Sequence, residues 1–121
     1  MTESKDRGLH KYRFKNLQHR AWQIAENHGF HSVDRNFGDC CTLIQTEVSE
    51  AFEDFRDQGK VDSKSFIERD GKPVGVPSEL ADIVIRCMDI AQEYEIDLEH
   101  EVIQKMEYNE SRPFKHGGKA L

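Results

Sequence analysis

The chain has 121 residues, of which 36% are hydrophobic and 33% are charged, and its formal net charge is −6 at pH 7. This length is enough for one domain with one modest core. The balance of hydrophobic and charged residues indicates a soluble globular protein whose core is small or shared between subunits. The negative charge argues against a binder of nucleic-acid polymers, and the lack of a long apolar stretch argues against a membrane protein.

Two helices are expected in the first half of the chain, at about 12–27 and 39–57. In both segments the apolar residues recur at the three- and four-residue spacing of a helix that buries one face. Gly29 and Gly59 follow these segments, and glycine is the residue that most often ends a helix.

Residues 59–77 hold three of the eight glycines and two of the three prolines, so we expect a loop there, with a short turn at 65–68. A third helix is expected after Ser78, as its N-cap, and a fourth after Asp97, as its N-cap. Pro113 marks the latest end of the fourth helix.

The pattern predicts an all-α fold, a four-helix bundle-type arrangement, within a single domain spanning 1–121. We expect flexible ends at about 1–11 and 117–121, because these segments are polar or glycine-bearing. We expect the apolar surface of the second and third helices to be too broad for one small bundle to cover, which predicts a homo-oligomer.

Two acidic pairs stand beside the most apolar segments. Glu47 and Glu50 lie three residues apart on the second helix, and Glu79 and Asp82 lie three apart on the third. Residues at this spacing share one face of a helix. Two solvated helix faces are the simple alternative, and Asp82 could also form an ordinary (i, i+4) ion pair with Arg86.

The third helix is apolar around most of its circumference, so we expect it to be buried nearly all round. One narrow polar strip remains on it, which should face a cavity or a subunit junction and consists of Glu79, Asp82, Arg86, Asp89 and Glu93. Four carboxylates from two neighbouring helices would form an oxygen-rich site that suits Mg²⁺, with Mn²⁺ as a substitute.

At these residues the sequence resembles the MazG-like all-α nucleoside triphosphate pyrophosphohydrolases, in their compact single-domain form. The family carries an ExxE motif and an ExxD motif on successive helices, which match Glu47/Glu50 and Glu79/Asp82 here. The ending "KMEYNESRPFKHGGK" is also similar to that of compact members, and the resemblance covers roughly residues 13–116.

The resemblance implies a Mg²⁺-dependent hydrolase that converts a nucleoside triphosphate and water to the monophosphate and pyrophosphate, clearing non-standard or surplus nucleotides. Glu47, Glu50, Glu79 and Asp82 would hold the metal, and Glu50, with Glu47, would act in catalysis by positioning the attacking water. The implied substrate-binding residues are Lys105, Asn109, Arg112, Trp22, His31, Arg86, Lys115 and His116. Core packing is an equal alternative for Trp22, and family members form dimers or tetramers.

Two other functions fit the same residues. One is a non-catalytic nucleotide- or metal-binding regulatory protein on the same helical bundle, and the other is an oligomeric scaffold whose acidic strip pairs with basic residues. The three cysteines are odd in number and form no CxxC motif, which favours a reducing compartment and a cytoplasmic location.

Overall fold

The computed structural model describes residues 13–31 and 34–114, and the expected flexible ends at 1–11 and 117–121 lie outside this part. Helices dominate the described residues, which confirms the all-α prediction. The elements are α2 (Phe14–Asn27), α3 (Phe37–Gln58), β1 (Phe66–Ile67), β2 (Pro73–Val74), α4 (Val76–Glu93) and α5 (Leu98–Ser111).

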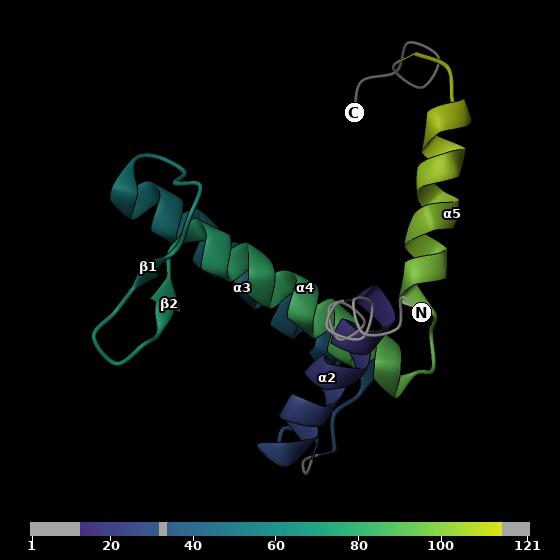
Figure 1. Cartoon of the computed structure of the whole chain (residues 1–121), viewed down its shortest axis with the longest axis horizontal. Coiled ribbons are helices and arrows are strands. Elements are labelled where there is room, and N and C mark those ends of the chain that lie inside the picture. The colour runs from purple at the N-terminus through teal and green to yellow at the C-terminus, as the bar shows by residue number, and fades with distance from the viewer. Residues whose placement is uncertain (1–12, 32–33, 115–121) are drawn as a thin grey trace, which may run out of the picture.

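Helix α4 is the centre of the fold because it packs against both α3 and α2 (Figure 1). It lies along α3, whereas α2 packs on its C-terminal half. The buried apolar residues lie on these three helices and are Ala21, Ala25, Cys40, Met88, Ile90 and Ala91. The core therefore belongs to α2, α3 and α4.

Helix α5 rises away from this core and touches α2 only near its own N-terminus (Figure 1). An ion pair of 3.2 Å between Lys15 Nζ and Asp97 Oδ2 and a hydrogen bond of 2.8 Å from Gln18 Nε2 to the Ile96 carbonyl hold that end. Within one chain, the fourth helix thus does not complete a four-helix bundle.

Local chemistry explains where α3 and α5 begin and where α3 ends. Asn36 and Asp39 form a reciprocal capping box at the start of α3, and Gly59 adopts the left-handed conformation at its end, with φ of 70°. The Asp97 side chain accepts a hydrogen bond from the His100 N–H, which confirms it as an N-cap. The predicted stop at Gly59 is also confirmed.

The predicted start of the third helix is wrong by a few residues. Helix α4 begins at Val76, after Gly75, and Pro77 lies inside its first turn, where a missing N–H removes no helical hydrogen bond. The Ser78 hydroxyl donates to the carbonyl of Pro73 at 3.0 Å instead of capping the helix.

The loop between α3 and α4 contains a short antiparallel hairpin. Phe66 pairs with Val74, and the turn is closed by a hydrogen bond from the Lys72 N–H to Asp70 Oδ1 and by Gly71, whose φ is 89°. Strands of two residues are too short to show alternation in the sequence, which is why only a turn was expected.

Helix α4 is not buried nearly all round within one chain, contrary to the prediction. Met88 to Ala91 are buried, but Leu80, Val84 and Ile85 are 52%, 47% and 48% exposed. The reason is that α2 covers only the C-terminal half of α4. An apolar side of the helix is left open.

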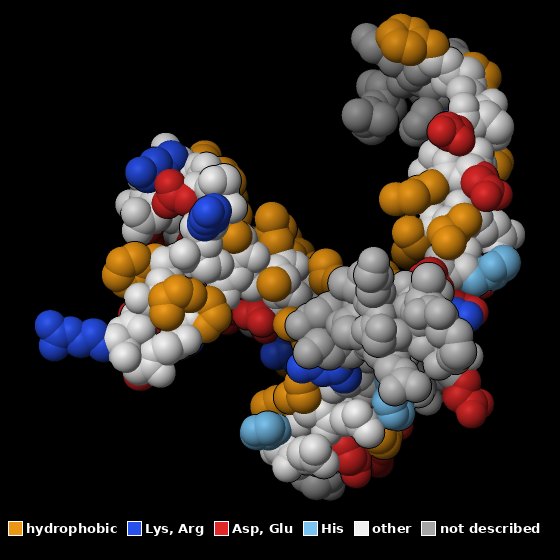
Figure 2. All heavy atoms as spheres, viewed as in Figure 1, with side chains coloured by type: hydrophobic (Ala, Val, Ile, Leu, Met, Phe, Trp, Pro, Cys, Tyr) orange, Lys and Arg blue, Asp and Glu red, His pale blue; other side chains and the backbone are white. Residues whose placement is uncertain are grey.

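Exposed apolar side chains gather along one side of the α3–α4 pair and on the side of α5 that faces it, across an open notch (Figure 2). On α3 and α4 the large ones include Val48, Phe52, Phe55, Leu80 and Val84, and on α5 they include Val102, Ile103 and Met106. We call these residues the apolar notch. In the described part of the chain, no helix is long and apolar enough to cross a membrane.

Candidate metal and nucleotide site

The packing of α3 against α4 brings three of the four predicted carboxylates together. Glu47, Glu50 and Glu79 each offer one oxygen, and these oxygens lie within 4.8 Å of one another. We call these three residues the acidic cluster. Such a convergence requires both helices, since residues 47 and 50 lie on one and residue 79 lies on the other.

Asp82, the fourth predicted ligand, lies beside the acidic cluster but outside this triad of oxygens. It lines a cavity of about 160 Å³ together with Glu47. Burial and the charge of Glu47 raise the pKa of Asp82, and Arg86 and Lys72 oppose this effect. Asp82 is therefore within electrostatic range of the cluster.

Two oxygens of the acidic cluster are buried without a hydrogen-bond partner among the described residues: Glu47 Oε2 and Glu79 Oε2. Burial, a hydrogen bond with Glu50 and the negative charge of Glu50 raise the pKa of Glu79 to about 7. Buried carboxylate oxygens are normally paired, because their desolvation is costly. An all-oxygen donor set with unpaired positions fits a hard divalent cation such as Mg²⁺ or Mn²⁺.

Arg86 forms an ion pair with one member of the acidic cluster, Glu47. Its Nε donates to Glu47 Oε1 at 2.7 Å, across the α3–α4 interface. The simple alternative, an ion pair with Asp82 on its own helix, is not formed within 4 Å in the described structure. Arg86 thus neutralises part of the charge of Glu47 while leaving Glu47 Oε2 unpaired.

A second acidic residue of the α4 strip, Asp89, has a complete set of partners. His31 Nε2 lies 2.8 Å from Asp89 Oδ1, and Arg35 Nη2 donates to Asp89 Oδ2 at 2.8 Å. His31 Nδ1 in turn lies 2.5 Å from Glu26 Oε2. Burial alone would lower the pKa of His31, but its hydrogen bonds with Glu26 and Asp89 raise it overall.

Trp22 belongs to the same network. Its indole Nε1 donates to Glu93 Oε2 at 2.6 Å, and its ring centroid lies 5.0 Å from that of His31. The described residues that line the two cavities near Asp89 do not include Trp22 or His31. Both side chains are therefore partners of acidic groups, and neither lines these two cavities.

The small cavity that contains Glu47 and Asp82 lies beside a larger one of about 660 Å³. Both are lined by Phe30, Arg86 and Asp89, and the larger one also includes Arg35, Asp34, Asp39, Thr42 and Leu43. We call the larger space the Arg35 cavity. Sequence reasoning missed Phe30 and Arg35, since they precede α3 in a segment without helical periodicity.

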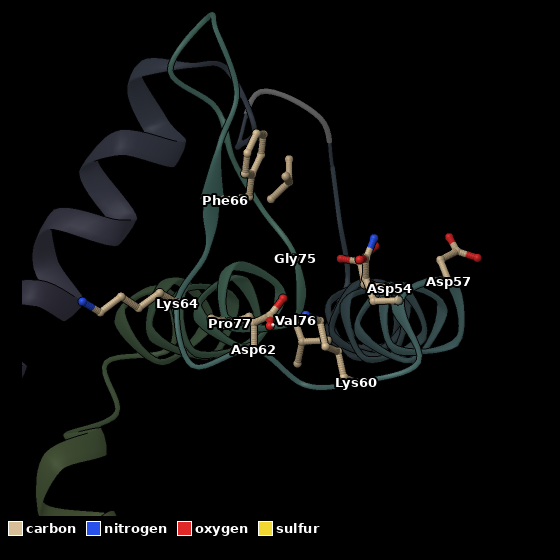
Figure 3. A pocket seen from close by; sticks show the side chains of 11 residues that line it. Asp54, Asp57, Lys60, Asp62, Lys64, Phe66, Gly75, Val76 and Pro77 are labelled. Atoms are coloured by element: carbon tan, nitrogen blue, oxygen red, sulfur yellow. Dashed lines mark ion pairs between the residues drawn. The ribbon is translucent and has the colours of Figure 1, made fainter.

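A third cavity, of about 370 Å³, lies under the hairpin at the opposite end of α4 (Figure 3). Asp54 and Asp57 at the end of α3 line it, together with Phe66 of the hairpin. Lys60 and Asp62, which pair at 3.5 Å, line it as well. Asp54 lies one turn beyond Glu50 and adds negative charge near Glu79.

The residues predicted to bind substrate from the fourth helix are not brought to the acidic cluster within one chain. Lys105 and Arg112 both lie over the Tyr108 ring, with 5.6 Å to its centroid, and Asn109 is exposed on the same projecting helix. Lys115 and His116 lie outside the described residues.

Comparison of the chain with protein-family models, with curated proteins and with solved structures finds no match. The site is therefore interpreted from its own geometry and from the motif residues.

Proposed function

We propose that this protein is a Mg²⁺-dependent nucleoside triphosphate pyrophosphohydrolase of the MazG-like type, which cleaves the α–β bond to release the monophosphate and pyrophosphate. Its substrates would be non-standard or surplus nucleotides. The observation that carries the proposal is the acidic cluster, in which two helices converge on buried oxygens that lack partners.

Glu47, Glu50, Glu79 and Asp82 would hold the metal. When bound, Mg²⁺ supplies charge neutralisation for phosphate oxygens and favours ionisation of an attacking water. The chain itself contributes the proton acceptor. Glu50 is the exposed member of the cluster and is placed to accept a proton from water that enters from solvent.

Arg86 supports the same reaction from the other side of Glu47. Its Nε donates to Glu47, and the Arg86 side chain lines both neighbouring cavities. A guanidinium at that position suits phosphate oxygens, because its fork geometry permits paired hydrogen bonds.

The proposal includes assembly into a homodimer or homotetramer in the cytoplasm. A second copy would cover the apolar notch, whose two sides are too far apart to cover each other (Figure 2). Such packing would also bring Lys105, Asn109 and Arg112 near an α3–α4 pair. Sedimentation should show an oligomer that Val84→Asp dissociates, whereas a wild-type monomer would refute the assembly.

The activity is tested by incubating the purified chain with a panel of nucleoside and deoxynucleoside triphosphates plus Mg²⁺, and following monophosphate and pyrophosphate. Wild type is compared with Glu50→Gln, which removes the proton acceptor. Glu53→Gln is the matched control, because Glu53 lies on the same helix but is exposed and paired with Arg56.

Pyrophosphate release that is lost in Glu50→Gln and kept in Glu53→Gln would support the enzyme. Nucleotide binding without turnover in wild type would instead favour the regulatory protein. Release of single orthophosphates would contradict the proposed bond cleavage.

A further inference from the structure

We propose that the Arg35 cavity binds the base of the nucleotide, that Arg35 selects a 6-oxopurine there, and that Phe30 provides the stacking surface. The inference rests on the proposed function in one respect, namely that the ligand is a nucleotide. It names the class of base, which the acidic cluster does not determine.

The first step is adjacency. Phe30, Arg86 and Asp89 line both the Arg35 cavity and the small cavity beside Glu47, so the two cavities are neighbours along α4. Along α4 the order is Glu79, Asp82, Arg86 and Asp89, which places carboxylates first and the Arg35 cavity last. Phosphates at the carboxylate end would leave the base at the Arg35 end.

The second step is the fixed position of Arg35. Its Nη2 donates to Asp89 Oδ2 at 2.8 Å, and the other oxygen of Asp89 is held by His31. The Arg35 side chain is only 14% exposed. A guanidinium carries five N–H donors in one plane, and the others on Arg35 have no partner among the described residues. It therefore presents oriented donors at the cavity wall.

The third step is chemical selection. A 6-oxopurine offers O6 and N7 as adjacent acceptors, which match an arginine fork. A 6-aminopurine keeps N7 as an acceptor but turns an amino donor toward the N–H that O6 would satisfy, and that N–H is then left unpaired, which is the stronger form of discrimination. Asp34 and Asp39 on the cavity wall provide acceptors for the N–H groups of the base.

The fourth step is the stacking surface. Phe30 is 62% exposed although it lines both cavities. An aromatic ring in this position can stack with any base, because every base has a π-face. Phe30 thus contributes affinity, while Arg35 contributes the choice of base.

The test is equilibrium binding of dGMP, dIMP and dAMP to the full chain with Mg²⁺, measured by calorimetry. Monophosphates need no turnover, so the test does not depend on hydrolysis. We expect wild type to bind dGMP and dIMP about tenfold more tightly than dAMP. Arg35→Met should abolish this difference, and Arg35→Lys, which keeps a positive charge for Asp89, should retain only part of it.

Two further variants guard against misfolding. Phe30→Ala leaves the side chains of the Asp89 network unchanged and should weaken the binding of dGMP and of dAMP equally. Arg20→Met replaces an exposed arginine on α2 and should change neither. Equal binding of the three monophosphates by wild type, or no binding of any, would overturn the inference. A preference for dGMP without pyrophosphate release would leave this inference standing and reject the enzyme, while unselective hydrolysis would do the reverse.

Discussion

Glu47 and Asp89 are equally buried, at 7% exposure each, yet they have opposite surroundings. Asp89 lies between His31 and Arg35, which satisfy both of its oxygens. Glu47 receives one hydrogen bond from Arg86 and otherwise faces Glu50 and Glu79. Among the described residues, both oxygens of Asp89 have partners, whereas Glu47 Oε2 has none.

We propose that this difference separates a structural ion-pair network from a site that holds an external cation. Buried charges are tolerated when their partners are close and geometrically matched, as at Asp89. Burial, together with the hydrogen bond and the negative charge of Glu50, raises the pKa of Glu79. The first arrangement is complete without ligand, and the second becomes favourable only when positive charge arrives.

The largest effect is expected from disrupting the Asp89 network, in which both carboxylate oxygens have partners. Asp89→Asn should lower the free energy of unfolding by about 3–5 kcal/mol, because it removes the buried counter-charge of Arg35 and one of the two acidic partners of His31. Urea denaturation at fixed protein concentration measures this. Glu47→Gln should be less harmful, since Arg86 is 36% exposed and can turn toward water. Equal losses in the two variants would remove the distinction.

The second largest effect is expected from adding Mg²⁺ to the acidic cluster. Mg²⁺ at 100 times its dissociation constant should stabilise the folded chain by about 2.7 kcal/mol, by mass action. Thermal unfolding with and without Mg²⁺ detects this shift. It should be absent in Glu50→Gln and present in Glu53→Gln. A wild-type melting temperature that is the same with and without Mg²⁺ or Mn²⁺ would favour the scaffold interpretation.

The third effect concerns pH in the absence of metal. The pKa of Glu79 is raised from its ordinary 4.5 to about 7, so the folded state retains a proton that the unfolded state has lost. Its contribution to stability is therefore full below pH 4.5 and is lost as the pH rises toward 7. The raised pKa of His31 acts in the same direction, so the readout is the difference between wild type and Glu79→Gln.

We expect Glu79→Gln in the presence of a chelator to raise the free energy of unfolding at pH 8 by about 1 kcal/mol, since it removes an anion from the acidic cluster. The gain should shrink as the pH falls to 5. A variant that is less stable than wild type at pH 8 would show that the Glu79 carboxylate has a partner of its own.

Sequence reasoning succeeded where helical periodicity decides the outcome. The spacing of Glu47 and Glu50 indicated one helix face, and the polar strip of α4 indicated the facing one, so their meeting could be predicted. Arg35 could not be found this way, because it lies outside a helix, and only the fold brings it to Asp89. For Lys105 and Asn109, periodicity gives a shared face but not the direction in which α5 projects.

The most direct test of the central claim is titration of Mn²⁺ into the chain, followed by electron paramagnetic resonance of the free ion. The account predicts saturable binding to wild type and to Glu53→Gln, with strong loss in Glu47→Gln, Glu50→Gln and Glu79→Gln. Mn²⁺ binding that is unchanged by these three substitutions, or absent from wild type, would contradict the claim that the acidic cluster holds a divalent cation.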